Sequence, residues 1–216
     1  YSQSHISRFD VGVVKKDMKT FIELGAADFD TLIDLNWRGI ICEPHPTHFD
    51  KLFSNNKNPN IKILDIAISD SRGKEIFYGP SQEFIDYCSN NKEDEWIKGI
   101  SGFLREGYEN RMERIIRENN HPDSFLFKKE VQKITLDELV YTNRIRSLDF
   151  LKVDTEGHDF RILNAYNWDI RPVFIKCEHT RGDNPDEYTD KILSLFDNKG
   201  YRWWEEKNDI YAIDMQ

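Results

Sequence analysis

The segment from Phe21 to Leu32, with the sequence FIELGAADFDTL, constrains the fold more than any other part of the chain. Its apolar run is typical of a buried strand that ends at Gly25, and apolar residues resume at helical spacing from Leu32. A glycine in a strand-to-helix turn lets the backbone approach a ligand, and a helix N-terminus offers unpaired N–H groups. The segment therefore predicts the first turn of a nucleotide-binding type of α/β fold, with a strand at 20–25 and a helix from about 29 to 37.

A second apolar strand, predicted at 38–43, ends on Glu43. This acid follows the first turn by roughly 20 residues, which is where Rossmann-like sites bind ribose hydroxyls. The first turn lacks the three spaced glycines of a dinucleotide fingerprint, so no pyrophosphate is indicated. A ribose without a pyrophosphate indicates S-adenosylmethionine as the cofactor.

The rest of the chain continues to alternate between strands and helices. Further strands are expected at 61–68, 75–78, 148–154, 173–177, 201–204 and 210–213, and helices after Pro46 and near 108–118, 135–141, 160–163 and 186–196. Such alternation produces a mainly parallel sheet, and a hairpin at the end adds an antiparallel strand. We therefore expect a Rossmann-like, three-layer α/β sandwich with a mainly parallel seven-stranded sheet and an antiparallel C-terminal strand.

The 216 residues have the length of one domain with a full core. Residues 1–19 are mostly polar and are expected to form a leading segment that lies against the domain. Residues 79–130 break the alternation and predict an insertion that covers the site as a lid, with a merely decorative excursion as the alternative. Because the sequence begins with Tyr1 rather than Met, we expect one domain of a longer polypeptide, whose other domains are its partners.

Charge and cysteine content argue against several classes of protein. The net charge of −9 disfavours nucleic acid as a partner, because such binders concentrate Lys and Arg on one face. No apolar run is long enough for a membrane span or a signal peptide. The three scattered cysteines, Cys42, Cys88 and Cys177, are too few for a zinc cluster or a disulfide framework and favour a reducing, cytoplasmic location.

Polar residues follow most of the predicted strands. Ligands of open α/β sheets bind outside the carboxyl ends of the strands, so these residues mark the expected site. They are Glu23 with Gly25, Glu43, Asp65 to Ser69, Asp154 with Glu156, and Glu178 with His179.

Five sequence motifs occur along the chain in the same order as in a known protein family. They are Phe21 to Ala26, Glu43-Pro44-x-Pro46-x-x-Phe49, Ala67-Ile68-Ser69-Asp70-x-x-Gly73, Ile134 to Leu139, and Asp149 to His158. In this the chain resembles the FkbM family of S-adenosylmethionine-dependent methyltransferases. The resemblance implies a class I methyltransferase fold and methyl transfer to a hydroxyl of a sugar or natural product. One departure is the first loop, which often reads Gly-Ala-Asn-x-Gly in the family, whereas Ala27, Asp28 and Phe29 follow Ala26 here.

The expected cofactor contacts follow from this likeness and from the needs of methyl transfer. Glu43 is expected to accept hydrogen bonds from the ribose hydroxyls. Gly25 and Ala26 would line the methionine side. The remaining expected cofactor residues are Glu23, Pro44, Asp65, Ala67, Ile68 and Asp154, with Asp65, Ala67 and Ile68 at the adenine and a core position as the alternative for Ile68.

Methyl transfer also needs a group that takes a proton from the acceptor. His179, Glu178 and His158 are candidates for this base, and His179 is preferred because it follows a strand end and titrates near neutrality. Asp154 either lies near the methionine ammonium or binds a metal. Asp154, Glu156, Glu178 and His179 together would suit Mg²⁺ or Mn²⁺, which would lower the pKa of the acceptor hydroxyl.

The acceptor is predicted from aromatic residues and from the family. Trp96, Tyr108, His121 and Trp203 are of types that stack on sugar faces, although core packing is the alternative for each. We therefore predict O-methylation of a sugar hydroxyl in a glycan or glycoconjugate. Two other hypotheses stay open. One is a catalytically silent module that binds a glycan or acts as a scaffold, which the altered first loop favours. The other is an NAD(P)-dependent oxidoreductase, which the missing glycine fingerprint disfavours.

Overall fold

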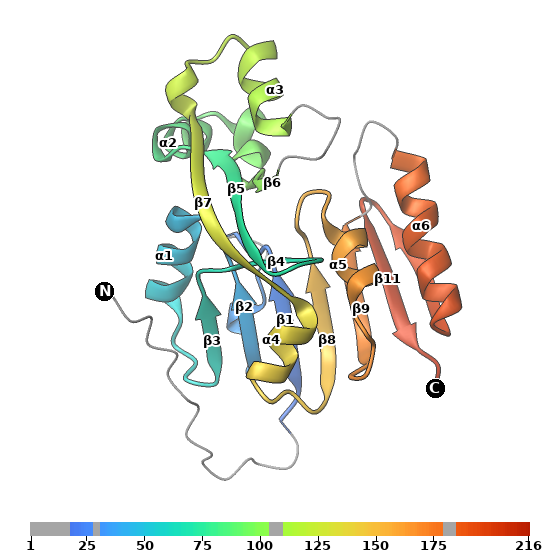
Figure 1. Cartoon of the computed structure of the whole chain (residues 1–216). Coiled ribbons are helices and arrows are strands. Elements are labelled where there is room, and N and C mark those ends of the chain that lie inside the picture. The colour runs from blue at the N-terminus through green and yellow to red at the C-terminus, as the bar shows by residue number, and fades with distance from the viewer. Residues whose placement is uncertain (1–17, 28–30, 104–109, 179–184) are drawn as a thin grey trace.

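The computed structural model describes residues 18–27, 31–103, 110–178 and 185–216, and its largest element is a seven-stranded sheet. Neighbouring parallel strands run from one edge to beyond the middle, and the last two strands complete the other edge (Figure 1). β11 is antiparallel to both of its neighbours, so the sheet is mixed. In spatial order the strands are β3 (Ile61–Leu64), β2 (Arg38–Cys42), β1 (Thr20–Leu24), β8 (Leu148–Val153), β9 (Pro172–Glu178), β11 (Asp209–Asp214) and β10 (Tyr201–Glu206).

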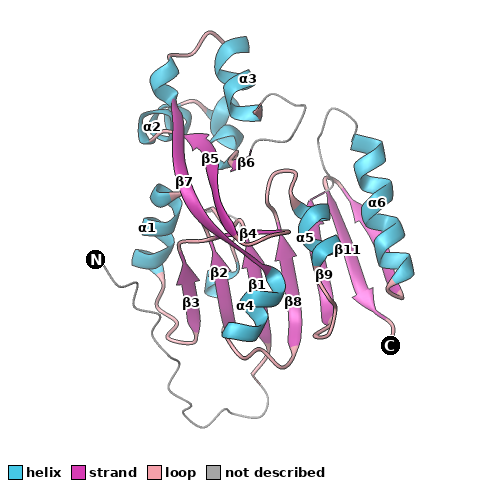
Figure 2. Cartoon of the chain, in the orientation of Figure 1, coloured by secondary structure: helices cyan, strands magenta, loops and turns pink. Residues whose placement is uncertain are grey.

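Helices pack on both faces of this sheet because its central strands are apolar on both sides. Ile22 and Leu24 face a cluster that includes residues of α4 (Leu136–Thr142), α5 (Asp159–Ala165) and α6 (Pro185–Asn198). Figure 2 shows α4 and α5 in front of the strands. On the opposite face, Phe21 and Ile41 pack with Leu52 of α1 (Pro46–Asn55). Fully buried parallel strands of this kind need cover on both faces.

A second sheet differs from what the sequence predicted. The expected strand at 61–68 is divided, since β3 joins the main sheet and β4 (Ala67–Ser69) joins the second sheet. β5 (Gly73–Pro80) contains the predicted 75–78 strand and pairs with β7 (Leu126–Thr135) and β6 (Gly102–Phe103). β7 was not predicted, because its middle carries the exposed charged run Lys128–Glu130 and lacks a buried alternation.

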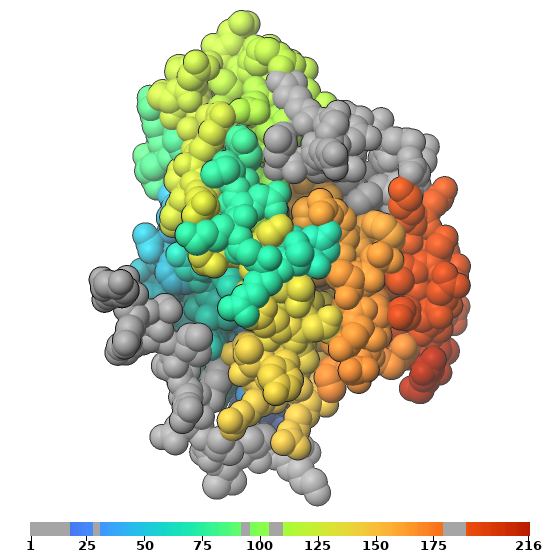
Figure 3. Space-filling model, in the orientation of Figure 1, coloured from blue at the N-terminus to red at the C-terminus, as the bar shows by residue number. Residues whose placement is uncertain are grey.

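The described residues of the range 79–130 form a lobe above the main sheet (Figure 1), and this lobe is at the top of the space-filling view (Figure 3). Besides the strand ends they contain α2 (Gln82–Asn90), the 3-10 segments η2 (Lys92–Gly99) and η3 (Asp123–Phe125), and α3 (Arg111–Glu118). The helix expected at 108–118 begins at Arg111 in the described chain. Buried residues of these elements, among them Phe84, Met112 and Phe125, form a hydrophobic core of their own.

The helix expected at 29–37 is wrong over the described residues 31–37, which contain only the 3-10 turn η1 (Leu32–Asp34). Leu32, Ile33, Leu35 and Trp37 all pack against the same cluster. An α-helix turns by about 100° per residue, so it would spread these four side chains around more than half of its circumference. A short turn brings them to one side.

The described helices include none with both the length and the apolar character that a membrane crossing needs. Cys42, Cys88 and Cys177 are buried free thiols, as small apolar residues in a core would be.

Candidate active site

A cavity opens where β1, β2 and β8 end and beside the start of β4, between the main sheet and the inserted lobe. It contains about 830 Å³ of space, part of which is open to solvent. The main-sheet side contributes Gly25, Ala26, Ala27, Cys42, Glu43, Pro44, Asp154, Thr155, Glu156 and His158, and the second sheet and the lobe contribute Ile66, Ala67, Ile68, Phe77, Trp96, Gly99, Ser101, Gly102 and Phe103.

Gly25 packs directly against the neighbouring strand end. Its φ is +74°, and a Cβ atom at this position would lie 2.0 Å from the carbonyl oxygen of Asp154. Backbone hydrogen bonds from Gly25 to Cys42 (3.0 Å) and from Asp154 to Leu24 (2.9 Å) hold the three strand ends together. Glycine is therefore required here to bring the strand ends close, as well as to leave the backbone open toward the cavity.

Glu43 is a buried carboxylate at the wall of the cavity. Its Oε1 accepts a hydrogen bond from the His45 N–H (2.7 Å) and its Oε2 accepts one from the Ala27 N–H (2.8 Å). Burial raises the pKa of Glu43, against the lowering effects of His48 and of the two N–H donors. Each carboxylate oxygen has two lone pairs, so each can accept one more hydrogen bond from a ligand hydroxyl.

Glu23 was expected to contact the cofactor, but it does not line the cavity. Its carboxylate pairs with the Lys152 ammonium at 3.1 Å and accepts hydrogen bonds from Thr31 Oγ1 (2.8 Å) and the Leu32 N–H (2.9 Å). Both Glu23 and Lys152 are buried. This carboxylate therefore fixes the loop that follows β1 to the adjacent strand β8.

Three carboxylates gather beside the cavity, at the ends of β8 and β9. One oxygen each of Asp154, Glu156 and Glu178 lies within 4.8 Å of the others, close enough to hold a metal ion together. The guanidinium of Arg111, at the start of α3, forms an ion pair with Glu156 and lies 5.7 Å from the ring of Trp96. Burial, followed by the charge of Glu178, raises the pKa of Glu156, and the charge of Arg111 opposes the rise. The inserted lobe thus places the positive charge of Arg111 next to the group of three carboxylates.

Asp159, the first residue of α5, forms hydrogen bonds with the two chain segments that carry these three carboxylates. Its side chain is fully buried, accepts hydrogen bonds from the hydroxyl and N–H of Thr155 (the latter at 2.9 Å), and accepts another from the Glu178 N–H at 3.1 Å. Burial raises the pKa of Asp159 to about 8. The residue therefore joins the loops after β8 and β9.

His158 is the described histidine that lines the cavity. Its Nε2 lies 3.0 Å from Ser69 Oγ, and its ring meets the edge of Phe103 with centroids 5.5 Å apart. Burial, together with the charge of Arg161, lowers the pKa of His158 to about 4, so the ring is neutral at pH 7. A neutral imidazole can accept a proton.

The other predicted residues divide into three groups. Asp65 is exposed and does not line the cavity, whereas Ala67 and Ile68 do. His121 packs on Phe84 and Phe125 inside the lobe, and Trp203 donates a hydrogen bond from Nε1 to Asp197 (2.8 Å), so neither lines the cavity. Tyr108 and His179 lie outside the described residues.

Sequence reasoning missed part of the side of the cavity formed by the second sheet and the lobe. Phe77 and Phe103 meet edge-to-face with ring centroids 5.6 Å apart and close the cavity above the strand ends. Their approach depends on the two-residue strand β6 pairing with β5, and so short a strand leaves no pattern in the sequence. The small residues Ser101 and Gly102 were missed for the same reason.

Fold and site together define an α/β protein with a ligand cavity at the carboxyl ends of its parallel strands. Residues 10–203 match the model of the methyltransferase FkbM domain, and the chain therefore belongs to this family of methyltransferases. The likeness seen in its motifs is thus confirmed.

Among solved structures, a crystal structure of the methyltransferase FkbM from Methylobacillus flagellatus KT is similar in fold. It aligns with a TM-score of 0.50 and 10% sequence identity over 91% of this chain and 43% of that chain. The present chain therefore spans less than half the length of that protein, and at this identity the likeness supports the fold alone. No curated protein matches the sequence significantly.

Proposed function

We propose that this domain uses S-adenosylmethionine to methylate a hydroxyl group of a sugar in a glycan or glycoconjugate. The observation that carries the proposal is the position of Glu43 beside the Gly25 turn in one cavity of a methyltransferase-family chain. The strand order of the main sheet, with its antiparallel β11, supports a class I methyltransferase fold. The buried cysteines agree with a reducing compartment, and we propose the cytoplasm.

The residues of the cavity fit this cofactor in three places. The two oxygens of Glu43 can accept hydrogen bonds from the two ribose hydroxyls. The backbone at Gly25 and Ala26 is open for the methionine part. Ala67, Ile68 and Phe77 give an apolar wall on which an adenine ring can pack.

S-adenosylmethionine, when bound, supplies a methyl group that its sulfonium makes electrophilic. The protein then has to hold the acceptor oxygen in line with the methyl–sulfur bond and to take up a proton. His158 is the candidate that takes the proton, because it is the described histidine that lines the cavity. His179, the first candidate from the sequence, stays a prediction.

The acceptor would enter beside Trp96. This indole is 51% exposed although it lines the cavity, and the Arg111–Glu156 pair lies next to it. An aromatic face beside charged hydrogen-bonding groups suits a sugar ring, which has an apolar face and polar edges. His121 and Trp203 are not part of this proposal, because neither lines the cavity.

A divalent metal is a further part of the proposal that needs its own test. Asp154, Glu156 and Glu178 provide oxygen ligands of the kind that Mg²⁺ and Mn²⁺ prefer. Arg111 already balances the charge of Glu156, so a cation would share or replace that contact.

The test is transfer of an isotope-labelled methyl group from S-adenosylmethionine to a panel of neutral, amino and acidic sugars, with added Mg²⁺ or with a chelator. We expect a labelled methyl ether on at least one sugar class and none with a Trp96→Ala variant at subsaturating acceptor. Cofactor binding without transfer to any sugar would contradict sugar O-methylation. It would instead favour the silent glycan-binding module, which the departure from the usual first loop at Ala27 also supports.

A further inference from the structure

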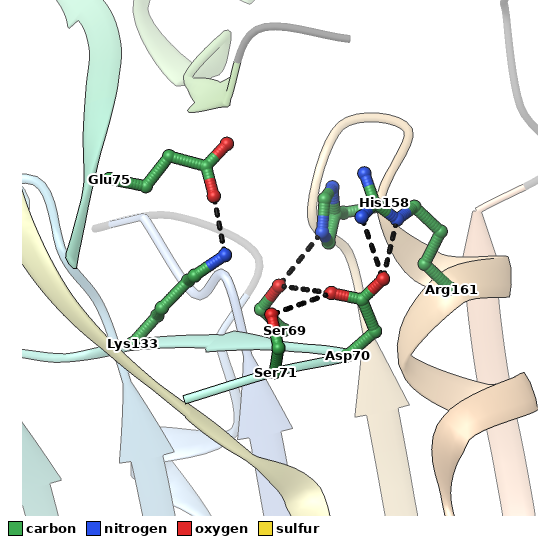
Figure 4. A network of polar contacts seen from close by, with 7 residues as sticks. All are labelled: Ser69, Asp70, Ser71, Glu75, Lys133, His158 and Arg161. Atoms are coloured by element: carbon green, nitrogen blue, oxygen red, sulfur yellow. Dashed lines mark hydrogen bonds and ion pairs between the residues drawn. The ribbon is translucent and has the colours of Figure 1, made fainter. Parts of the chain in front are cut away.

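Figure 4 shows a chain of polar side chains that joins His158 to Arg161. His158 lines the cavity, and Arg161 is exposed at the surface. His158 Nε2 lies 3.0 Å from Ser69 Oγ, at the end of β4. Ser69 Oγ lies 3.1 Å from Asp70 Oδ1, and Arg161 of α5 donates from Nε (2.9 Å) and Nη2 (2.6 Å) to Asp70 Oδ2. The chain therefore links the second sheet to the first turn of α5.

The charge on Asp70 determines where the protons of this chain lie. Burial alone would raise the pKa of Asp70, but the hydrogen bonds and charge of Arg161, with the hydroxyl of Ser69, lower it. An ionised carboxylate only accepts hydrogen bonds, and hydrogen bonds to it are stronger than those to a neutral group. The single hydroxyl proton of Ser69 therefore points to Asp70, which leaves its oxygen to accept a proton from the imidazole.

We propose that Ser69, Asp70 and Arg161 hold His158 in the Nε2–H tautomer, so that Nδ1 presents the lone pair that accepts the proton of the acceptor hydroxyl. The role as base rests on the proposed function, whereas the tautomer does not. Ser69 does not line the cavity, so it acts through His158 as a positioning residue.

The surroundings of the ring agree with this assignment. Nδ1 is on the other side of the ring from Ser69, and the side chain of His158 does not cap α5 although the residue occupies its N-cap position. Within the described chain the hydrogen bond to Ser69 is the one that orients this imidazole. The charged groups that face it are Asp70, Arg161, Glu75 of β5 and Lys133 of β7, and the last two form an ion pair at 2.5 Å.

The proposed step balances without another reactant. The O–H bond of the acceptor breaks, and its proton forms an N–H bond at Nδ1. The oxygen electron pair forms the new bond to the methyl carbon, while the methyl–sulfur bond breaks and its electrons stay on sulfur. The ring, now protonated at both nitrogens, keeps its hydrogen bond to Ser69, and the negative charge of Asp70 lies behind it until the proton leaves to solvent.

The test reads the tautomer directly by nuclear magnetic resonance. The intact chain is labelled with ¹⁵N-histidine, long-range ¹H–¹⁵N correlations are recorded at pH 7.5, and the signal of His158 is assigned by its loss in His158→Gln. We expect the Nε2–H pattern in the wild type and in Ser69→Thr, which keeps the hydroxyl. Ser69→Ala and Asp70→Asn should move the ring toward a mixture of tautomers or Nδ1–H.

Ser71→Ala is the matched control, because the Ser71 hydroxyl also donates to Asp70 Oδ1 (3.2 Å) but does not bond to the ring. It should leave the tautomer unchanged. An Nδ1–H pattern in the wild type, or a Ser69→Ala spectrum with the wild-type pattern, would overturn the proposal.

Activity and cofactor titration separate this proposal from the proposed function. Ser69→Ala and Asp70→Asn should lower kcat by about 10- to 100-fold and leave S-adenosylhomocysteine affinity within about twofold, since only proton transfer is impaired. An unchanged kcat with the expected tautomer shift would overturn the role of His158 as base. Absence of cofactor binding in the wild type would instead remove the proposed function and leave the tautomer assignment standing.

Discussion

Two residues at the cavity have a backbone conformation that their side chains disfavour. Ala27 has a φ of +46° and Glu156 a φ of +54°, both in the left-handed region that glycine and asparagine adopt more readily. Ala27 donates its N–H to Glu43, and Glu156 pairs with Arg111. Strained positions persist where their surroundings hold them and are common at functional sites. Here the strained conformations direct the Ala27 N–H to Glu43, the candidate for ribose binding, and the Glu156 carboxylate to Arg111 of the lobe.

Replacement of Ala27 by glycine tests the first of these positions. The left-handed conformation destabilises a folded alanine by roughly 1–2 kcal/mol, and glycine removes this cost. The greater conformational entropy of glycine in the unfolded chain cancels about 0.5–1 kcal/mol of the gain. Ala27→Gly should therefore raise the free energy of unfolding by about 0.5–1 kcal/mol in urea denaturation. A loss of stability would show that Ala27 is not held at positive φ in solution.

Gly25→Ala should have the opposite effect. The added methyl group would overlap the carbonyl oxygen of Asp154 at a positive φ, so the ends of β1 and β8 would have to separate. We expect a loss of at least about 3 kcal/mol in the free energy of unfolding, comparable to other substitutions that force a backbone shift. Gly73→Ala, whose Cβ would meet only Lys133 Cε at 4.0 Å, is a control for glycine at positive φ without a backbone clash. Equal losses in the two variants would contradict the close contact.

At the level of elements, the central strands β1 and β8 are joined by a buried ion pair as well as by their backbone. Glu23 and Lys152 are 0% and 3% exposed, and burial raises the pKa of Glu23 while Lys152 opposes the rise. A buried pair of this kind adds little stability over apolar residues, but the loss of one partner strands a charge. The ion pair therefore requires an acidic residue at position 23 when position 152 is a lysine.

Lys152→Met should lower the free energy of unfolding by about 3–5 kcal/mol, because Glu23 would remain buried without its ammonium partner. The double variant Glu23→Gln with Lys152→Met should recover most of this loss, since glutamine can still accept the hydrogen bond from Leu32. Denaturant unfolding of the two variants measures the difference. If the double variant is no more stable than Lys152→Met, the cost comes from packing and the account of the pair is wrong.

The C-terminal edge of the sheet depends on a second ion pair. The Arg171 guanidinium donates to both carboxylate oxygens of Asp214 at 2.7 and 3.0 Å and to the Lys199 carbonyl at 2.7 Å. These hydrogen bonds hold the pKa of Asp214 below its usual value of 3.8. They join the start of β9, the end of β11 and the turn after α6.

A depressed acid pKa predicts how stability depends on pH. In the window below about pH 4 the unfolded chain binds a proton at Asp214 that the folded chain does not, so the contribution of the pair is complete above this window and is lost as the pH falls through it. Asp214→Asn should be about 1 kcal/mol less stable at pH 7, and the difference should shrink below about pH 4. Unfolding curves from pH 3 to 7 measure it. A difference that does not change with pH would assign the effect to geometry rather than charge.

The elements with continuous apolar patterns could be predicted from the sequence, and those held by long-range contacts could not. The strands around Ile22, Ile40 and Leu151 are buried on both faces, so their composition alone marks them. The turn at Leu32 and the strand β7 depend on tertiary partners. At the site, Gly25 and Glu43 belong to a local motif. His158 also does, and Ser69 was among the strand-end residues expected at the site. Phe103 reaches the ring from another sheet, and nothing near it in sequence indicates that approach.

In the whole molecule, the cavity lies between a sheet and an inserted lobe that are tied together at its rim. His45 Nε2 bonds to the Pro80 carbonyl (2.8 Å) and His48 Nε2 to the Lys98 carbonyl (2.9 Å), both at the side of α1. Arg111 joins the lobe to the loop after β8 on the other side. Trp96 and Phe103 of the lobe line the cavity between these attachments.

We propose that this cavity binds the cofactor through Glu43, and isothermal titration with S-adenosylhomocysteine measures that binding. The wild type should bind, Glu43→Gln should bind at least about tenfold more weakly through the loss of charge-assisted hydrogen bonds, and NAD⁺ should not bind. Asp65→Asn is the matched control, because it changes an exposed carboxylate directly after β3 that does not line the cavity, and it should bind as the wild type does. No binding by the wild type, or equal binding by Glu43→Gln, would contradict the account.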